Sequence, residues 1–207
     1  SAVLLEKSLN NNGFSTLSYA ADVSKPNEVN RMVADVIAKF GKIDVLINNA
    51  GIAQQKLFTD LTVEDWRAML DTNLSGVFNC SQEALRRHML PVHSGVILNI
   101  SSMWGQVGAS CEVHYSAAKA GVSNFTQWLA VHFAGAGIRV NAIAPGFFST
   151  EQNKALLWNE DGTPTARTGK ILAATPMGRF GQPQELLGAL LFLVDSKAAS
   201  FVTGVII

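Results

Sequence analysis

The chain has 207 residues, of which 48% are apolar and only 15% are charged, so it can bury a sizeable core and is not a disordered protein. Sixteen basic and sixteen acidic residues cancel and no basic run is present, which makes nucleic acid and anionic membranes poor candidate partners. The sequence shows no signal peptide and no apolar run of about twenty residues that would span a bilayer. We therefore expect one soluble, cytoplasmic domain over residues 1–207.

The cysteines and histidines form no metal-binding pattern. Cys80 and Cys111 lie far apart in the sequence, which is typical of reduced cysteines in an intracellular protein. The four histidines (His88, His93, His114 and His132) have none of the spacings that bind zinc. We expect no metal site.

The first quarter of the chain predicts helices alternating with strands. Residues 3–9 read as the end of a helix, and residues 14–20 alternate as a strand that ends at Asp22 and Val23. A second helix is expected to begin around Ser24 and Pro26 and to end at Gly41. Residues 43–47 are almost continuously apolar, which predicts a strand buried on both faces.

The same alternation continues to the end of the chain. We expect a helix from Thr59 or Thr62 to about residue 89, strands over 95–100, 138–143 and 201–207, and helices over 115–133 and 183–194. Four leucines of the last helix should face the core (Leu186, Leu187, Leu190 and Leu191). Residues 147–180 are long and locally polar, and we expect them to form a substrate-binding lid.

Alternating strands and helices predict an α/β fold with a doubly wound parallel sheet. In such sheets ligands gather at the carboxyl ends of the strands. Polar or glycine-containing motifs follow the predicted strands at these ends, around Asp22, in residues 48–51, at Ser101 and Ser102, and at Pro145 and Gly146. The sequence therefore predicts a ligand site along this edge of the sheet.

Tyr115 and Lys119 are four residues apart, so on a helix their side chains leave the same face. An ammonium group beside a phenol favours the phenolate and lowers the tyrosine pKa. Such a tyrosine can exchange a proton with a carbonyl or alcohol oxygen, and Ser102 can hydrogen-bond that same oxygen. The spacing alone is equally typical of an ordinary amphipathic helix, so the interpretation depends on the neighbouring motifs.

Taken together, the motifs resemble those of the short-chain dehydrogenase/reductase family over almost the whole chain. The matching residues are Asp22-Val23, Asn48-Asn49-Ala50-Gly51, Asn73, Ser102, Tyr115, Lys119 and Pro145-Gly146 with Thr150. The resemblance implies a Rossmann-like fold and an NAD- or NADP-dependent oxidoreductase that acts on a small carbonyl or alcohol substrate. It also implies a homo-oligomer, commonly a tetramer, for which the predicted helix over 115–133 offers four outward-facing apolar candidates (Phe125, Trp128, Leu129 and Phe133). These residues could instead belong to the core, since periodicity alone does not decide between the two.

The resemblance implies roles for individual residues. Tyr115 would be the general acid/base, Ser102 would polarise the carbonyl, Lys119 would lower the Tyr115 pKa and bind the nicotinamide ribose, and Asn73 would hold a relay water. Cofactor contacts would come from Asp22, Val23, Asn49, Ala50, Gly51, Pro145, Gly146, Phe148 and Thr150. Asn49 can instead be a turn former, whereas Asn73 is unfavourable inside a helix without a specific bond.

Residues 156–162 and 175–181 resemble those of sugar-acid reductases, in particular D-mannonate oxidoreductases, which interconvert D-mannonate and D-fructuronate. Asn153, Lys154, Arg167, Lys170 and Arg179 could bind such a polyhydroxy acid. They could equally be solvated charges or, for Arg179, part of a structural salt bridge. A 3-oxoacyl thioester, another alcohol, or a catalytically silent scaffold are the alternatives.

The chain departs from the family where the glycine-rich loop T-G-x-x-x-G-x-G and the first two strands would stand. The residue that selects NAD or NADP would also lie there. We expect that the chain is part of a longer protein. Without those strands, residues 43–47 would form an apolar exposed edge.

Overall fold

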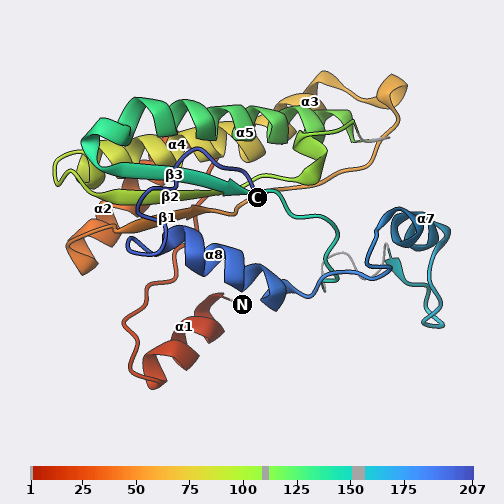
Figure 1. Cartoon of the computed structure of the whole chain (residues 1–207), viewed down its shortest axis with the longest axis horizontal. Coiled ribbons are helices and arrows are strands. Elements are labelled where there is room, and N and C mark those ends of the chain that lie inside the picture. The colour runs from red at the N-terminus through yellow and green to blue at the C-terminus, as the bar shows by residue number, and fades with distance from the viewer. Residues whose placement is uncertain (1, 109–111, 151–156) are drawn as a thin grey trace.

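The sheet of the described chain has three parallel strands. The computed structural model describes residues 2–108, 112–150 and 157–207. In it, β1 (Val45–Asn48), β2 (Gly95–Ile100) and β3 (Ile138–Ile143) lie side by side in the order β1-β2-β3 (Figure 1). Ile97 of β2 is in register with Leu46 on one side and Val140 on the other. The predicted α/β fold with a parallel sheet is confirmed.

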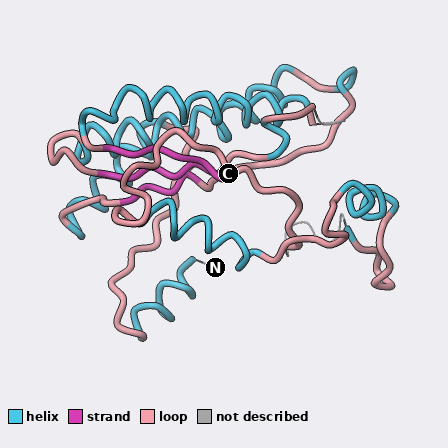
Figure 2. The backbone as a smooth tube through the Cα atoms, viewed as in Figure 1, coloured by secondary structure: helices cyan, strands magenta, loops and turns pink. Residues whose placement is uncertain are grey.

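Helices cover both faces of this sheet. On one face lie α4 (Gly76–Ala84) and α5 (Val113–Phe133), and on the other lies α8 (Leu187–Val194) (Figure 2). Ile97 points toward the α4/α5 layer and joins its core, whereas its neighbour Leu98 packs with Leu193 of α8. Successive strand residues face opposite sides, so a nearly continuous apolar strand supplies both cores.

A long helical region runs from Thr62 to Met89. It consists of α3 (Val63–Leu70), a π-turn over Asp71–Ser75, α4 and a second π-turn over Leu85–Met89. Thr62, rather than Thr59, caps it: its Oγ1 accepts from the Asp65 N–H at 3.1 Å, and the Asp65 carboxylate accepts from the Thr62 N–H at 3.0 Å. The predicted helix is correct, and the first π-turn contains Asn73.

Two short helices precede the sheet. Helix α1 (Ala2–Asn11) has no buried residue, whereas α2 (Pro26–Phe40) packs Val29 and Val33 against Cys80 of α4. As predicted, α2 ends at Gly41, which adopts the left-handed conformation with φ +77°.

The predicted strand over residues 14–20 is wrong. This segment has no strand partner among the described residues, and its polar groups bond elsewhere: Thr16 Oγ1 donates to Asn10 Oδ1, and the Thr16 carbonyl accepts from Lys39 Nζ at 2.8 Å. A parallel strand needs a neighbour to accept its backbone bonds. The same reason makes β1 an edge, with Val45 38% and Ile47 41% exposed. The prediction that β1 is buried on both faces is therefore wrong, and the exposed apolar edge is observed.

The segment predicted as a lid contains a helix that the sequence did not predict. Helix α7 (Ala166–Ala174) begins at Thr165, whose hydroxyl accepts from the Thr168 N–H at 3.3 Å. Ile171 of α7 packs with Leu157 and Phe180 in a small core of its own. Figure 1 shows α7 set apart from the sheet. The two large apolar residues of this helix, Ile171 and Leu172, are adjacent, so the sequence shows no repeating apolar spacing that would predict a helix.

The end of the chain also differs from the prediction. A 3-10 turn (Pro183–Leu186) leads into α8, where Leu190 and Leu193 contact the core, but Leu187 and Leu191 are 49% and 60% exposed. Residues 201–207 form only an isolated parallel bridge, between Ile206 and Ala142 of β3, rather than a full strand. Within the described residues no helix is long and apolar enough to cross a membrane.

Two neighbouring glycines provide a test of the turn between α5 and β3. Gly137 has φ +75°, and a Cβ placed on it would lie 2.5 Å from the His93 carbonyl oxygen. A Cβ on Gly135 would meet nothing within 4 Å. We expect Gly137→Ala to lower the free energy of unfolding by roughly 1–3 kcal/mol, and Gly135→Ala to raise it by up to roughly 1 kcal/mol. Urea denaturation of both variants measures this, and equal effects would contradict the account.

Candidate active site

The carboxyl ends of the three strands meet at one edge of the sheet, as predicted. Residues 49–51 follow β1, Ser101 and Ser102 follow β2, and Pro145 and Gly146 follow β3. The amino-terminal half of α5, which carries Tyr115 and Lys119, crosses this edge. The structure therefore brings together motifs that lie up to a hundred residues apart in the sequence.

A chain of buried amide and hydroxyl groups locks the strands to the helices behind them. Asn48 Nδ2 donates to Asn99 Oδ1 at 2.8 Å and to Ser81 Oγ at 3.0 Å, and Asn99 Nδ2 donates to Thr126 Oγ1 at 2.9 Å. All four residues are buried, so each unmade bond would cost the desolvation of a polar group. This network was not predicted from the sequence, although two asparagines in strands that are otherwise apolar were the available signal.

The turn of α5 that carries Lys119 is held directly against the end of β2. Ser101 Oγ donates to the Lys119 carbonyl at 3.1 Å and lies 2.7 Å from Ser123 Oγ. The 3-10 turn over Met103–Gly105 packs on the same place, since a Cβ at Gly105 would lie 2.7 Å from the Lys119 carbonyl carbon. Only glycine permits this close approach.

Ser102, Tyr115 and Lys119 form one cluster. Ser102 and Tyr115 line the same cavity, and the Ser102 hydroxyl accepts from the Trp104 N–H at 3.2 Å. Lys119 Nζ lies 5.7 Å from the centre of the Tyr115 ring and donates to the Ile100 carbonyl at 2.7 Å. Lys119 is only 5% exposed. A serine, a phenol and an ammonium group thus converge beside one cavity.

Burial is the main influence on both ionisable groups of this cluster. It lowers the pKa of Lys119 to about 8. It raises the pKa of Tyr115, an effect to which the Glu112 carboxylate adds and which the hydrogen bond with Ser102 opposes. The net direction of the Tyr115 pKa in this chain is therefore upward, because desolvation of the phenolate is the largest effect, and the expected lowering by Lys119 stays a prediction.

Asn73 lies beside this cluster and is completely buried. Its Oδ1 accepts from the Ile52 N–H at 2.8 Å, and its Nδ2 donates to the Ile52 carbonyl at 2.8 Å. A Cβ on Gly51 would lie 3.0 Å from Asn73 Oδ1 and 3.9 Å from Lys119 Nζ. Asn73 thus anchors the segment after β1, and its specific bonds explain an asparagine in a helical region. Its role as a water-holding relay stays a prediction.

The other predicted cofactor residues line the same edge or its flank. Asn49 and Ala50 are exposed after β1, the Pro145 carbonyl accepts from the Met103 N–H at 3.2 Å, and Phe148 pairs with Gly181 in a short bridge. Thr150 is exposed at the end of that segment. Their contacts with a cofactor remain predictions.

Asp22 and Val23 lie just before α2 and are held by hydrogen bonds to Ser24 and Asn79. The Asp22 carboxylate accepts from the Ser24 N–H at 3.0 Å and from the Ser24 hydroxyl at 2.7 Å, which lowers its pKa. The Val23 carbonyl accepts from Asn79 Nδ2 at 2.9 Å. These bonds fix the backbone here, and the predicted contact with adenine stays a prediction.

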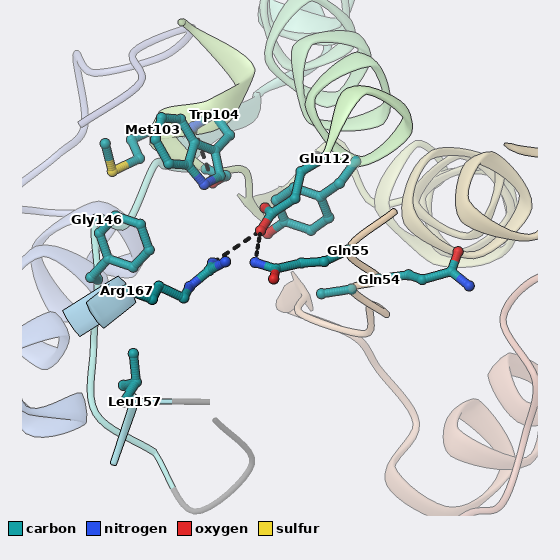
Figure 3. Close-up of a pocket in the computed structure, with 12 residues that line it drawn as sticks. Gln54, Gln55, Met103, Trp104, Glu112, Gly146, Leu157 and Arg167 are labelled. Atoms are coloured by element: carbon teal, nitrogen blue, oxygen red, sulfur yellow. Dashed lines mark hydrogen bonds and ion pairs between the residues drawn. The ribbon is translucent and has the colours of Figure 1, made fainter. Parts of the chain in front are cut away.

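A cavity of about 500 Å³ opens beside Ser102 and Tyr115 (Figure 3). Six of its lining side chains are polar: Gln54, Gln55, Ser102, Glu112, Tyr115 and Arg167. Apolar contact comes from residues that include Trp104 and Phe147, whose rings meet edge to face with centroids 5.7 Å apart. The cavity can therefore hydrogen-bond a polar molecule while stacking on its carbon skeleton.

The predicted substrate residues have different outcomes. Asn153 and Lys154 lie outside the described residues. Arg179 forms two bonds with the Glu185 carboxylate, at 2.7 and 2.6 Å, and does not line the cavity. For Arg179 the structural salt bridge is thus the observed arrangement, and the prediction that it binds substrate is corrected. Arg167 lines the cavity, and Lys170 lines an adjoining one.

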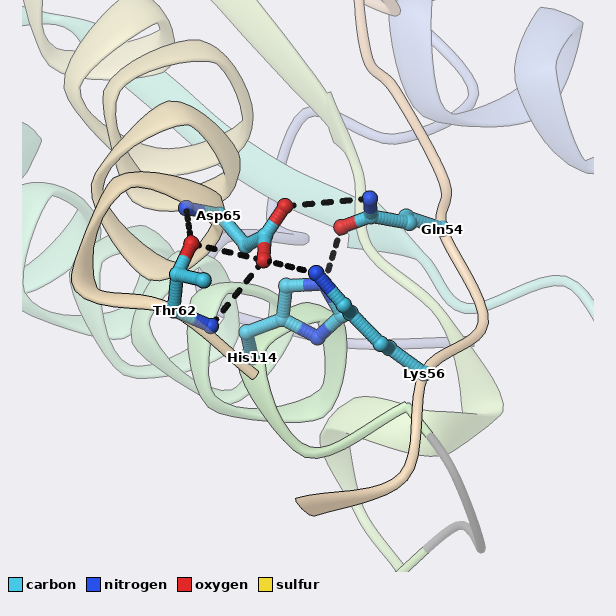
Figure 4. A network of polar contacts seen from close by, with 5 residues as sticks. All are labelled: Gln54, Lys56, Thr62, Asp65 and His114. Atoms are coloured by element: carbon cyan, nitrogen blue, oxygen red, sulfur yellow. Dashed lines mark hydrogen bonds and ion pairs between the residues drawn. The ribbon is translucent and has the colours of Figure 1, made fainter. Parts of the chain in front are cut away.

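A second polar network, also missed by the sequence analysis, holds the cavity wall that contains Gln54 (Figure 4). Gln54 Nε2 donates to Asp65 at 3.1 Å, and Gln54 Oε1 lies 3.3 Å from His114 Nε2. Lys56 Nζ binds the other Asp65 oxygen at 2.6 Å and is the largest influence that lowers the pKa of Asp65. His114 is fully buried, and burial lowers its pKa. The network ties the segment after β1 to α3 and α5.

The chain is similar to known oxidoreductases along most of its length. A family model described as enoyl-(acyl carrier protein) reductase matches residues 4–207. The uncharacterized oxidoreductase UxuB of Bacillus subtilis (strain 168) is 42% identical over 208 residues, covering 93% of this chain and 74% of that protein. A 3-oxoacyl-[acyl-carrier-protein] reductase of Synechocystis sp. is 40% identical over 193 residues, again covering 93% and 74%.

Solved structures show the same similarity. A protein from Haemophilus influenza, provisionally assigned as a D-mannonate oxidoreductase and holding bound NAD, superposes with a TM-score of 0.90 at 39% identity. The alignment covers 99% of this chain and 79% of that one. A gluconate 5-dehydrogenase from Burkholderia cenocepacia J2315, in complex with NADP and tartrate, superposes with a TM-score of 0.89 at 33% identity, covering 99% and 77%.

Burial of Lys119 predicts a pH-dependent stability. Its pKa is about 8 in the folded chain, against an ordinary value of 10.5, so the unfolded chain binds more protons between these values and stability rises with pH across this window. We expect the unfolding free energy of the wild type, relative to Lys119→Met, to increase by roughly 3 kcal/mol from about pH 7 to about pH 10.5. Denaturant unfolding at a series of pH values measures it, and a pH-independent difference would contradict the prediction.

Proposed function

This chain belongs to the short-chain dehydrogenase/reductase family and is an NAD(P)-dependent oxidoreductase, and we propose that its substrate is a sugar acid. The reaction would transfer a hydride between the nicotinamide and a secondary alcohol or ketone of this acid. D-mannonate and D-fructuronate are the proposed pair.

The polar lining of the cavity beside Ser102 and Tyr115 is the observation that carries this proposal. A polyhydroxy acid presents hydroxyl groups along its whole length, and Gln54, Gln55 and Glu112 offer donors and acceptors to them. The structural relatives support the same substrate class, since one is provisionally assigned as a D-mannonate oxidoreductase and another, a gluconate dehydrogenase, binds tartrate.

The residues at the strand ends fit the nicotinamide ribose of the cofactor. Lys119 has three N–H donors, of which the Ile100 carbonyl takes one, so two remain for the ribose hydroxyl groups. Gly51 has no side chain between its backbone and Lys119 Nζ, which leaves room for close approach. Pro145 and Gly146 would lie on the nicotinamide side. When bound, the cofactor supplies or accepts the hydride.

Tyr115 then has the role of proton donor in the reducing direction. Its raised pKa keeps the hydroxyl protonated near neutral pH, so it can donate to the carbonyl oxygen as negative charge develops there. Ser102 would hydrogen-bond the same oxygen and hold it in place. The Lys119 ammonium would stabilise the phenolate that Tyr115 becomes, and a water on Asn73 would return the proton from solvent.

A second candidate is reduction of a 3-oxoacyl thioester. It is favoured by one observation, an adjoining cavity of about 470 Å³ in which Ile171, Ala174 and Pro176 offer an apolar wall for an acyl chain. The similarity to a 3-oxoacyl-[acyl-carrier-protein] reductase supports it as well. A silent scaffold is less well supported, because a scaffold needs neither Ser102 and Tyr115 in one cavity nor a buried lysine beside them.

A substrate panel tests these proposals. We expect oxidation of D-mannonate to exceed that of xylitol, and reduction of D-fructuronate to exceed that of acetoacetyl thioester, by roughly tenfold or more in kcat/KM, with NAD and NADP compared side by side. Tyr115→Phe should lower kcat by roughly 10²–10⁴ while quenching of nicotinamide fluorescence still reports cofactor binding. Turnover of the thioester alone would favour the second candidate, and binding without any turnover would favour the scaffold.

We also propose a homo-oligomer, a tetramer by analogy with the family, that assembles through the outer surface of α4 and α5. Phe78 and Trp128 are 45% and 55% exposed and line a groove of about 390 Å³, and Val131, also on α5, is 83% exposed. Of the four residues predicted to face outward, Trp128 does so, and Phe125 and Phe133 are half-buried. The prediction for Leu129 is wrong, because this residue lies in the core.

Light scattering checks the assembly. By light scattering the wild type should have the mass of an oligomer. The double variant Trp128→Arg/Val131→Glu should shift toward the mass of the monomer, because desolvating a charge in an apolar interface costs several kcal/mol. Phe58→Arg is the matched control, since Phe58 is 75% exposed and does not line the groove. A wild-type monomer, or a shift with the control alone, would refute the proposal.

A further inference from the structure

One ion pair connects the predicted lid to the catalytic helix across the cavity. Arg167 extends from α7 into the cavity, and its Nη2 donates to Glu112 Oε1 at 3.0 Å (Figure 3). Glu112 directly precedes α5, three residues before Tyr115. The pair therefore lies in the wall of the cavity that Ser102 and Tyr115 also line, and it joins α7 to the start of α5.

Glu112 is a buried carboxylate with two partners. It is 8% exposed, and the same Oε1 that accepts from Arg167 also accepts from Gln55 Nε2 at 2.7 Å. A buried carboxylate that lost its partners would be strongly destabilising. These contacts hold Glu112 in one position, so that it can in turn hold the guanidinium.

Arg167 keeps hydrogen-bonding capacity that this pair does not use. A guanidinium has five N–H donors, and in the described part of the chain the only partner of this group is Glu112, through Nη2. Its side chain is 36% exposed, and it lines the cavity that Ser102 and Tyr115 also line. The remaining donors are available to a group inside the cavity.

We propose that Arg167 recognises the carboxylate of the substrate and that Glu112 positions Arg167 for this contact, an inference that rests on the sugar-acid function proposed above. A guanidinium can bind a carboxylate through two parallel N–H donors on one edge while another nitrogen keeps its bond to Glu112. Arg179 is not placed for this role, because it does not line the cavity and both of its terminal nitrogens donate to Glu185. Recognition by Arg167 would select acids over neutral polyols of the same carbon chain.

The test compares D-mannonate with D-mannitol, which differ in that a hydroxymethyl group replaces the carboxylate. A charge-assisted bond of the usual strength corresponds to roughly 10- to 100-fold in affinity. We expect Arg167→Met to raise KM for D-mannonate by roughly that factor and to leave the D-mannitol KM within about threefold. Arg167→Lys should restore part of the loss, since it keeps the charge but not the paired donors.

Arg86→Met is the matched control. Arg86 also binds a glutamate, Glu83, at 2.7 Å, but its side chain is 65% exposed and does not line the cavity. We expect this variant to keep the wild-type preference for the acid. Circular dichroism and thermal unfolding of every variant exclude a general loss of structure.

The positioning role of Glu112 has its own readout. Glu112→Gln should raise KM for D-mannonate with a smaller change in kcat, and the double variant with Arg167→Met should show no further increase in KM, because both changes remove the same contact. Additive effects on KM would overturn the positioning role.

The outcomes separate this inference from the proposed function. If the wild type oxidises D-mannonate and Arg167→Met affects the acid and the polyol equally, the carboxylate contact is wrong and the function stands. If the wild type acts only on other carbonyl compounds, the proposed function fails and the inference fails with it. If Arg167→Met raises the KM for D-mannonate alone and Arg167→Lys raises it less, both the proposed function and the carboxylate contact are supported.

Discussion

The arrangement of this protein depends on buried hydrogen bonds that fasten α5 to the ends of the parallel strands. Asn48, Asn99 and Thr126 connect β1 and β2 to the helix, and Ser101 bonds the backbone of Lys119 itself. Apolar packing alone would hold the helix on the sheet but would leave its rotation and register loosely specified, since hydrophobic contact is not directional. The polar bonds select one position, in which Tyr115 meets Ser102 and Lys119 meets Ile100.

Desolvation controls the electrostatics of the site. It lowers the pKa of Lys119 and raises the pKa of Tyr115, so both groups are shifted toward their neutral forms in the chain on its own. The Glu112 carboxylate adds to the effect on Tyr115, and its pairing with Arg167 offsets that negative charge. The chemistry proposed for the phenol thus depends on a charge balance that reaches from the catalytic helix to the lid.

The segment around α7 is stabilised by a core of its own. Its helix packs on a small core formed by Leu157, Ile171 and Phe180, separate from the cores on the two faces of the sheet. A small core lets this segment vary without disturbing the sheet, which is common for segments that determine substrate choice. In this chain α7 carries Arg167 in the cavity wall, while Ser102 follows β2 and Tyr115 stands on α5.

The sequence by itself determined the alternation of elements, the three strands of the sheet, and the set Ser102, Tyr115 and Lys119, because these follow from periodicity and from motifs of fixed spacing. The apolar exposed edge at β1 was also predictable, but the sequence did not determine that residues 14–20 form no strand, because a strand depends on what lies beside it. Nor could it distinguish Arg167 from Arg179, since both stand in polar stretches with similar composition. Only the tertiary structure decided that one of these arginines pairs with Glu185 on the surface and the other with Glu112 in the cavity, because the partner of a charge is set by distance in space. For the same reason the direction of the Tyr115 pKa required the fold, since burial is a property of the packed chain.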